Sequence, residues 1–136
     1  MLPATWSHGN PVDILGDAGA DRYQGALKAL LADRQVDAVF VLNCPVGVAD
    51  SLEAAKAVVA ALAGGPRIPV IACWVGDSVS AEPRRLLIEN KLPSYETPDE
   101  GVQAFMHLVS YHRNQQLLME TPPASAEALP ERNAVV

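Results

Sequence analysis

The sequence predicts an α/β protein with a flavodoxin-like, three-layer α/β/α sandwich built around a mostly parallel sheet. Apolar runs of strand length alternate with amphipathic helical segments, and short turns join them. Apolar residues occupy successive positions in the strands, which is typical of parallel strands covered on both faces. In such folds ligands bind at the carboxyl ends of the strands, which here lead into residues 43–49, 76–80 and 16–20.

The first half of the chain contains two predicted helices and one predicted strand. A helix over residues 20–33 has Asp21 in its first turn and one apolar face, made of Tyr23, Ala26, Leu27, Leu30 and Leu31. A strand follows at 37–42. The second helix begins near Asp50, which forms a candidate capping box with Glu53, and ends at residues 64–66. Its apolar stripe consists of Leu52, Ala55, Val58, Val59 and Leu62.

The second half repeats this alternation. Residues 69–75 form a buried strand, and a third helix follows with Leu86 and Leu87 facing inward. Residues 92–95 form a short, edge-like strand. Residues 97–100 combine a cap, a helix-starting proline and a returning glutamate, which predicts a fourth helix with room to continue through Leu117. Its predicted inner face consists of Val102, Phe105, Met106, Val109 and His112.

The composition limits the classes of function. With 136 residues, 49% of them hydrophobic, the chain supports one folded core. A formal net charge of -6 without basic clusters argues against a nucleic-acid or membrane-surface partner. Because neither a signal segment nor an apolar run of membrane-spanning length is visible, we expect a cytoplasmic location. Cys44 and Cys73 lie in or beside predicted buried strands, so we expect reduced thiols of low reactivity.

The ends of the chain differ in character from its middle. Residues 1–8 are predicted to be a lead-in from a preceding domain, residues 9–120 the folded domain, and the Pro- and Ala-rich residues 121–136 a linker or disordered tail. We therefore expect the sequence to be a fragment of a longer protein.

The main candidate site is the turn between the first predicted strand and the second helix. Backbone N–H groups and a helix N-terminus there could hold a phosphate without any basic side chain. Any turn of this kind in an α/β protein has the same pattern, however, and Asp50 would repel an anion if it pointed inward. No known nucleotide phosphate loop is present. The candidate residues are Cys44, Pro45, Val46, Gly47, Val48, Ala49 and Asp50.

Other polar residues favour structural interpretations. Asp13 and Asp17 could belong to a ligand loop, but their Asn-Pro and Gly-Asp context favours turn chemistry. The three histidines are predicted to be surface or core-edge residues, and the spacing between positions 107 and 112 does not suit a metal pair. We interpret Cys44 as a small apolar residue that fills space at the end of a strand, rather than as a reactive nucleophile. We therefore predict no catalytic residue and no metal site within this chain.

Several stretches together resemble the NDP-forming, including ADP-forming, acyl-CoA synthetases (acetate–CoA ligases). The similarity is to their second succinyl-CoA-synthetase-like, flavodoxin-type domain. It rests on residues 6–18, 22–23, 26–27, 36–39, 43–45, 69–76, 95–98 and 117–123.

This resemblance implies that the chain takes part in a reaction carried out by several domains of one enzyme. In that family an acyl-CoA and phosphate are interconverted with an acyl phosphate and CoA, and a histidine of the preceding domain carries the phosphoryl group to an NDP. The resemblance implies that residues 44–50 and the following helix face this phosphohistidine. It also implies CoA, ATP/ADP and Mg²⁺ as cofactors of the intact protein, and its CoA-binding, phosphohistidine and ATP-grasp domains as partners. The isolated chain is then expected to be inactive.

The sequence departs from the family pattern in the turn. Many relatives have a hydroxyl or amide residue beside the proline, where this chain has Val46 and Gly47, and Ser51 replaces a frequent proline. The turn then has only backbone N–H groups as hydrogen-bond donors. Some relatives fuse this region to a GNAT acetyltransferase, so the alternative function is a non-catalytic regulatory or interaction domain of a protein acetyltransferase.

Overall fold

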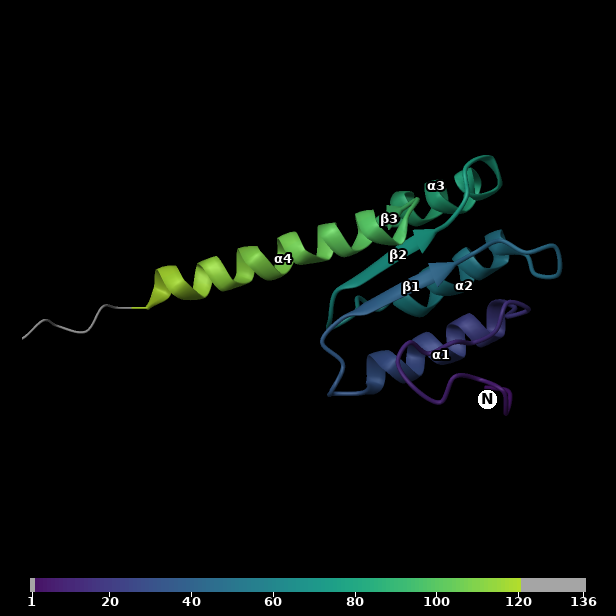
Figure 1. Ribbon diagram of the computed structural model, residues 1–136, viewed down its shortest axis with the longest axis horizontal. Coiled ribbons are helices and arrows are strands. Elements are labelled where there is room, and N and C mark those ends of the chain that lie inside the picture. The colour runs from purple at the N-terminus through teal and green to yellow at the C-terminus, as the bar shows by residue number, and fades with distance from the viewer. Residues whose placement is uncertain (1, 121–136) are drawn as a thin grey trace, which may run out of the picture.

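The predicted helices and strands are present in the structure (Figure 1). The computed structural model describes residues 2–120, so the predicted linker or tail at 121–136 lies outside the described residues. The elements in chain order are α1 (Ala20–Ala32), β1 (Val39–Asn43), α2 (Ser51–Leu62), β2 (Val70–Trp74), the 3-10 helix η1 (Ser78–Ser80), α3 (Ala81–Glu89), β3 (Ser94–Tyr95) and α4 (Pro98–Met119).

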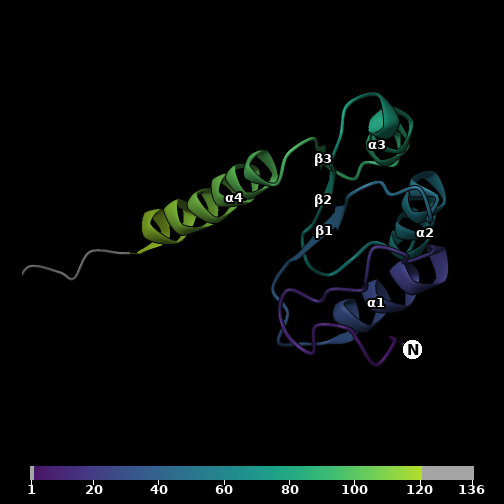
Figure 2. The ribbon, with the colours of Figure 1, turned by 45° about the vertical axis from the view of Figure 1, so that its right-hand side comes forward.

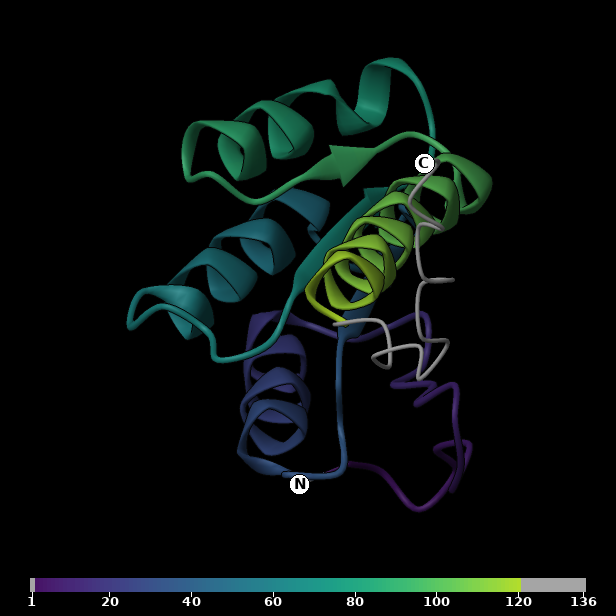
Figure 3. The ribbon, with the colours of Figure 1, turned by 90° about the vertical axis from the view of Figure 1, so that its left-hand side faces the viewer.

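The three strands form one parallel sheet in the order β1-β2-β3. β1 pairs with β2 from Val39 opposite Val70 to Asn43 opposite Trp74, so both strands end at the same edge. Helices α1, α2 and α3 lie on one face of the sheet, and α4 starts on the opposite face (Figures 2 and 3). The predicted α/β class with a parallel sheet and helices on both sides is confirmed.

The core lies between the sheet and the α1–α3 layer. Trp74 is its largest fully buried side chain, and Leu27 of α1 and Leu87 of α3 are buried in the same cluster. In α2, Ala54 and Ala55 are fully or almost fully buried. Their small side chains allow the helix to lie close to the sheet, so that the larger Trp74 ring fills the space between the layers.

The helix caps agree only partly with the sequence-based expectation. Asp50 caps α2 by accepting hydrogen bonds from the N–H groups of Leu52 and Glu53, at 2.8 and 3.2 Å. The predicted return contact from Glu53 is wrong, because its carboxylate pairs with Lys56 at 2.7 Å. At α4 the capping box is complete, with reciprocal 3.3 Å hydrogen bonds between Thr97 and Glu100.

The predicted inner face of α4 is largely wrong. Val102 and Met106 are 49% and 47% exposed, and His112 is also exposed, whereas Phe105 and Val109 are half-buried. Only the first turns of α4 approach the sheet, and the rest of the helix projects from the body (Figures 1 and 2). Helical periodicity identifies an apolar stripe, but it does not reveal whether another element covers that stripe. Within residues 2–120 no helix is both long and apolar enough to cross a membrane.

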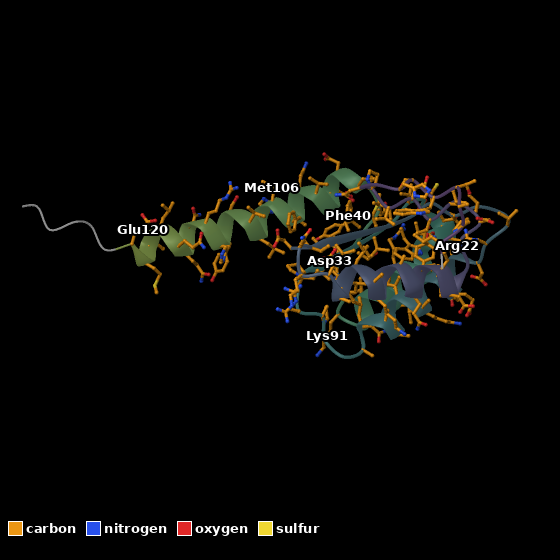
Figure 4. All side chains as sticks on the ribbon, turned by 90° about the horizontal axis from the view of Figure 1, so that it is seen from below. Arg22, Asp33, Phe40, Lys91, Met106 and Glu120 are labelled. Carbon is orange, nitrogen blue, oxygen red and sulfur yellow. The ribbon has the colours of Figure 1, made fainter. Side chains whose placement is uncertain are left out.

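Gly101 is the residue through which α4 approaches the sheet. It is the one buried position among the described residues of this helix. A Cβ atom added there would lie 2.6 Å from the Cζ atom of Phe40. Figure 4 shows Phe40 beside the start of α4, whereas Met106 lies further along the projecting helix. The absence of a side chain at Gly101 therefore permits the contact between α4 and β1.

We expect Gly101→Ala to lower the free energy of unfolding by about 1–3 kcal/mol, because the added methyl group overlaps the Phe40 ring. Urea denaturation followed by circular dichroism measures this change. Gly25→Ala in α1 is the matched control, since an added Cβ meets nothing within 4 Å there and should stabilise the helix by about 0.5–1 kcal/mol. In a Phe40→Ala background, Gly101→Ala should also become stabilising. An equal effect in both backgrounds would contradict the proposed overlap.

Candidate functional site

The candidate turn and the loop after β2 meet at the carboxyl edge of the sheet. The N–H of Val75 donates to the carbonyl of Asn43 at 2.9 Å, which joins the two segments directly. The turn therefore lies at the position where parallel α/β sheets bind ligands, as the sequence predicts.

The turn itself is open to solvent. Cys44, Val46, Gly47 and Val48 are exposed, with Val48 at 78%. Within the turn, the N–H of Ala49 reaches the carbonyl of Val46 at 3.4 Å. No residue from 2 to 120 accepts a hydrogen bond from the N–H of Gly47 or of Val48. These two amides are therefore available as donors.

Asp50 limits what the N-terminus of α2 can bind. Its carboxylate already accepts from the second and third N–H groups of the helix. This arrangement stabilises the helix start, since those amides otherwise lack partners. It also places a negative charge beside the positive end of the helix dipole, where a second anion would be bound more weakly.

A buried polar network lies beneath the turn. Asn43 is only 8% exposed, and its amide nitrogen donates to the Tyr23 hydroxyl at 2.9 Å. Ser51 donates to the Asn43 amide oxygen at 2.7 Å, and the indole N–H of Trp74 donates to the Ser51 carbonyl at 3.2 Å. Burial raises the pKa of Tyr23 above its ordinary value. The network joins α1, β1, β2 and the first residue of α2.

Sequence analysis missed this network as a unit. The sequence feature that could have indicated the network is Asn43, a polar residue at the end of the apolar run of β1. An amide at such a position must find partners when it is buried. Which partners it finds depends on the packing of α1 and α2, which no local pattern specifies.

A second residue that sequence analysis missed is Arg84 of α3. Its guanidinium is nearly buried and donates to the carbonyls of Trp74, at 2.9 Å, and of Gly76. It also donates to the Asp77 carbonyl at 3.1 Å and pairs with Glu96 at 3.0 Å. These contacts organise the loop after β2. Because both terminal nitrogens of Arg84 are engaged, we assign it a structural role rather than that of an anion ligand.

The other predicted residues have the structural roles expected of them. Asp13 accepts from the N–H of Leu15 at 2.8 Å, and Asp17 pairs with Arg22 at 2.6 Å. The hydrogen bond from Arg22 lowers the pKa of Asp17. His8 is exposed, with its ring 3.0 Å from the nearby Ala4 carbonyl and packed against Trp6 at a centroid distance of 4.7 Å, and positions 107 and 112 are also exposed. Within residues 2–120 no three His, Cys, Asp or Glu side chains form a candidate metal site.

The two cysteines differ, contrary to the expectation that both are buried. Cys73 lies within β2 and is fully buried, and this burial raises its pKa. Cys44 is exposed. β1 ends at Asn43, so Cys44 is the first residue beyond the sheet and no helix covers it.

Curated relatives of this chain are ligases. It is 35% identical over 113 residues to the acetate–CoA ligase (ADP-forming) I of Archaeoglobus fulgidus, which covers 83% of this chain and 16% of the relative. It is 38% identical over 95 residues to the succinate–CoA ligase (ADP-forming) subunit beta of Chloroflexus aurantiacus, which covers 69% of this chain and 24% of the relative. The chain thus spans a quarter or less of the length of these relatives. No family model matches it.

Solved structures show the same relationship. The apo form of the dinucleotide-forming acetyl-coenzyme A synthetase 1 of Candidatus Korarchaeum cryptofilum matches with a TM-score of 0.80 and 33% identity, covering 88% of this chain and 26% of that chain. The same enzyme in complex with phosphate and ADP matches with a TM-score of 0.79. The resemblance to ADP-forming acyl-CoA synthetases that was inferred from the sequence is confirmed.

We expect Arg84→Met to lower the free energy of unfolding by about 3–5 kcal/mol, because it removes the donors for three carbonyls, whereas the lost pair with Glu96, which is 61% exposed, adds little. Arg85→Met is the matched control. Arg85 is exposed and lies 3.9 Å from Glu89, so its loss should cost less than about 1 kcal/mol. Chemical denaturation of both variants tests the difference. Equal stability of the two variants would contradict the structural role of Arg84.

We expect one thiol of the native protein to react rapidly with an aromatic disulfide reagent and the second to react only after unfolding. The first is Cys44, which is exposed, and the second is Cys73, which is buried with a raised pKa. Thiol titration before and after adding denaturant measures both. Cys44→Ser should abolish the fast phase, whereas Cys73→Ser should leave it unchanged. Slow native labelling of Cys44 would show that the turn is closed.

Proposed function

We propose that this chain, a homologue of ADP-forming acetate–CoA and succinate–CoA ligases, contributes the flavodoxin-like domain of such an acid–CoA ligase and presents the N-terminus of α2 to a phosphohistidine carried by another domain. The observation that supports this most strongly is the 35% identity over 83% of the chain to an acetate–CoA ligase. The described part of the chain adds a turn with free amides at the sheet edge.

The proposed role is electrostatic. A phosphorylated histidine carries negative charge, and the N-terminus of a helix is equivalent to roughly half a positive charge. The free N–H groups of Gly47 and Val48 add two hydrogen-bond donors, and none of the turn residues 44–50 is a cation. An exposed helix end contributes only about 0.3–1 kcal/mol, so the stabilisation in the intact enzyme must come largely from the other domain.

We propose that Asp50 limits the strength of the interaction between the N-terminus of α2 and the phosphohistidine. Its carboxylate caps α2 and occupies two of the helix amides, which reduces the attraction for a phosphoryl group. A weak interaction suits a carrier, because a phosphohistidine that was held tightly would not pass its phosphoryl group on.

We propose that CoA, ATP/ADP and Mg²⁺ act at other domains of the intact protein. A structural relative has been solved in complex with phosphate and ADP. Residues 2–120 contain neither a glycine-rich nucleotide loop nor a candidate metal cluster. The proposed partners are therefore the CoA-binding, phosphohistidine and ATP-grasp domains, and this chain alone should form no acyl-CoA.

In a longer protein that includes the histidine-bearing and ATP-grasp domains, we expect Gly47→Val to lower the steady-state amount of phosphohistidine by about 2–5-fold, because a branched side chain obstructs close approach to the turn amides. Asp50→Asn keeps a capping side chain but removes its charge, so it should raise that amount. Acid-labile incorporation of labelled phosphate from ATP measures both effects.

The structure offers a matched control for this experiment. A Cβ atom added at Gly47 or at Gly64 meets nothing within 4 Å, so both valine variants should fold. Gly64 lies beyond the other end of α2, so Gly64→Val should leave phosphohistidine unchanged. If Gly47→Val accumulates as much phosphohistidine as Gly64→Val, the turn only connects β1 to α2 and the proposed role is wrong.

A further inference from the structure

A cavity of about 450 Å³ lies between the N-terminal segment, α1 and β1. Its volume is within the range of about 300–1,000 Å³ that is usual for small-molecule sites. Its walls are mostly aliphatic, with contributions from Val12, Ile14, Ala26, Leu30 and Val41. The residues that end β1 and begin the candidate turn, including Cys44, line one side of it.

The cavity exists because the N-terminal segment does not pair with the sheet. Residues 11–15 form no strand, although they line the same cavity as β1. Arg22 of α1 holds this segment in place by donating to the Ile14 carbonyl at 2.9 Å and pairing with Asp17 at 2.6 Å. These contacts secure the segment to the helix and leave a space between it and β1.

The Tyr23 hydroxyl is the polar group best suited to a ligand. It accepts a hydrogen bond from Asn43 at 2.9 Å, whereas its own proton reaches only the Leu42 carbonyl, at 3.4 Å. The second distance is longer than a normal O–H···O hydrogen bond, so a better acceptor could replace it. The phenol carries this proton at neutral pH because the ordinary pKa of tyrosine is about 10, and burial raises the pKa of Tyr23 further.

The charges around the cavity exclude one class of ligand. Among its described lining residues there is no lysine or arginine, and Asp13 contributes a carboxylate. An anion would therefore lose its hydration without gaining a cationic partner. A neutral molecule would avoid this cost.

We propose that this cavity binds a small uncharged molecule with an apolar body and one carbonyl-type acceptor, which receives the proton of the Tyr23 hydroxyl. The aliphatic walls contact the apolar body, and Cys44 lies at the side next to the turn. Turn residues Cys44, Pro45, Val46 and Ala49 line this cavity, but Gly47 and Val48 do not, so the proposal does not depend on the exposed amides to which we assign the phosphohistidine role.

The test uses prodan, a neutral naphthyl ketone whose fluorescence reports the polarity of its surroundings. We expect the 136-residue chain to bind it saturably, with a blue-shifted emission and a dissociation constant in the range of tens to hundreds of micromolar. Ala26→Phe, which fills the cavity, should weaken binding at least tenfold. Ala29→Phe is the matched control, because Ala29 is exposed on the same helix, and it should change the affinity less than twofold. Tyr23→Phe should weaken binding about threefold or more and shift the emission of bound probe.

A second measurement does not depend on fluorescence. Prodan should slow the labelling of Cys44 by a thiol reagent in the Ala29→Phe protein but not in the Ala26→Phe protein. Circular dichroism confirms that each variant is folded, and Leu30→Trp replaces Ala26→Phe if that variant is not. Non-saturable binding, equal affinity of the filled and control variants, or tighter binding of the anionic dye 1-anilinonaphthalene-8-sulfonate at this cavity would overturn the proposal.

Discussion

The side-chain amide of Asn43 is the interaction on which the carboxyl edge of this domain depends. It bonds to α1 through Tyr23 and to α2 through Ser51, while the Asn43 carbonyl accepts from the N–H of Val75. A buried amide is costly unless its donors and acceptor are paired, so the position of each helix is specified by the need to satisfy it. Trp74 adds a bond to the Ser51 carbonyl, which links the largest side chain of the core to the same network.

The two loops at this edge are stabilised by opposite means. The loop after β2 surrounds the guanidinium of Arg84, which gathers three carbonyl groups and one carboxylate. The turn after β1 has no such cation, and two of its amides have no partner among residues 2–120. One loop is therefore organised around an internal charge, whereas the other presents its donors outward. This difference is what makes the turn after β1 the better candidate for contact with an anionic partner.

Much of the fold follows from local sequence patterns, because periodicity, caps and turn residues act over a few positions. The bounds of α1 and the complete capping box of α4 are of this kind. Glu53 and Lys56 are three residues apart on α2, so local spacing allowed their pairing as well as a capping box, and the structure contains the pairing. The exposed Cys44 and the projecting face of α4 could not be obtained from local patterns, because each depends on where a neighbouring element ends. For the same reason the Asn43 network and the Arg84 cluster, whose members are distant in sequence, were identified only in three dimensions.

The attachment of α4 has a mechanical consequence. The helix has 22 residues, yet its one buried residue, Gly101, lies in the first turns, against Phe40. At 1.5 Å per residue such a helix is about 33 Å long, so a tilt of about 10° at its base displaces its far end by about 6 Å. A change of tilt at the base of α4, where the helix contacts β2, β3 and Phe40 of β1, would therefore be largest at Leu117, Leu118 and Met119, the apolar residues near the tip.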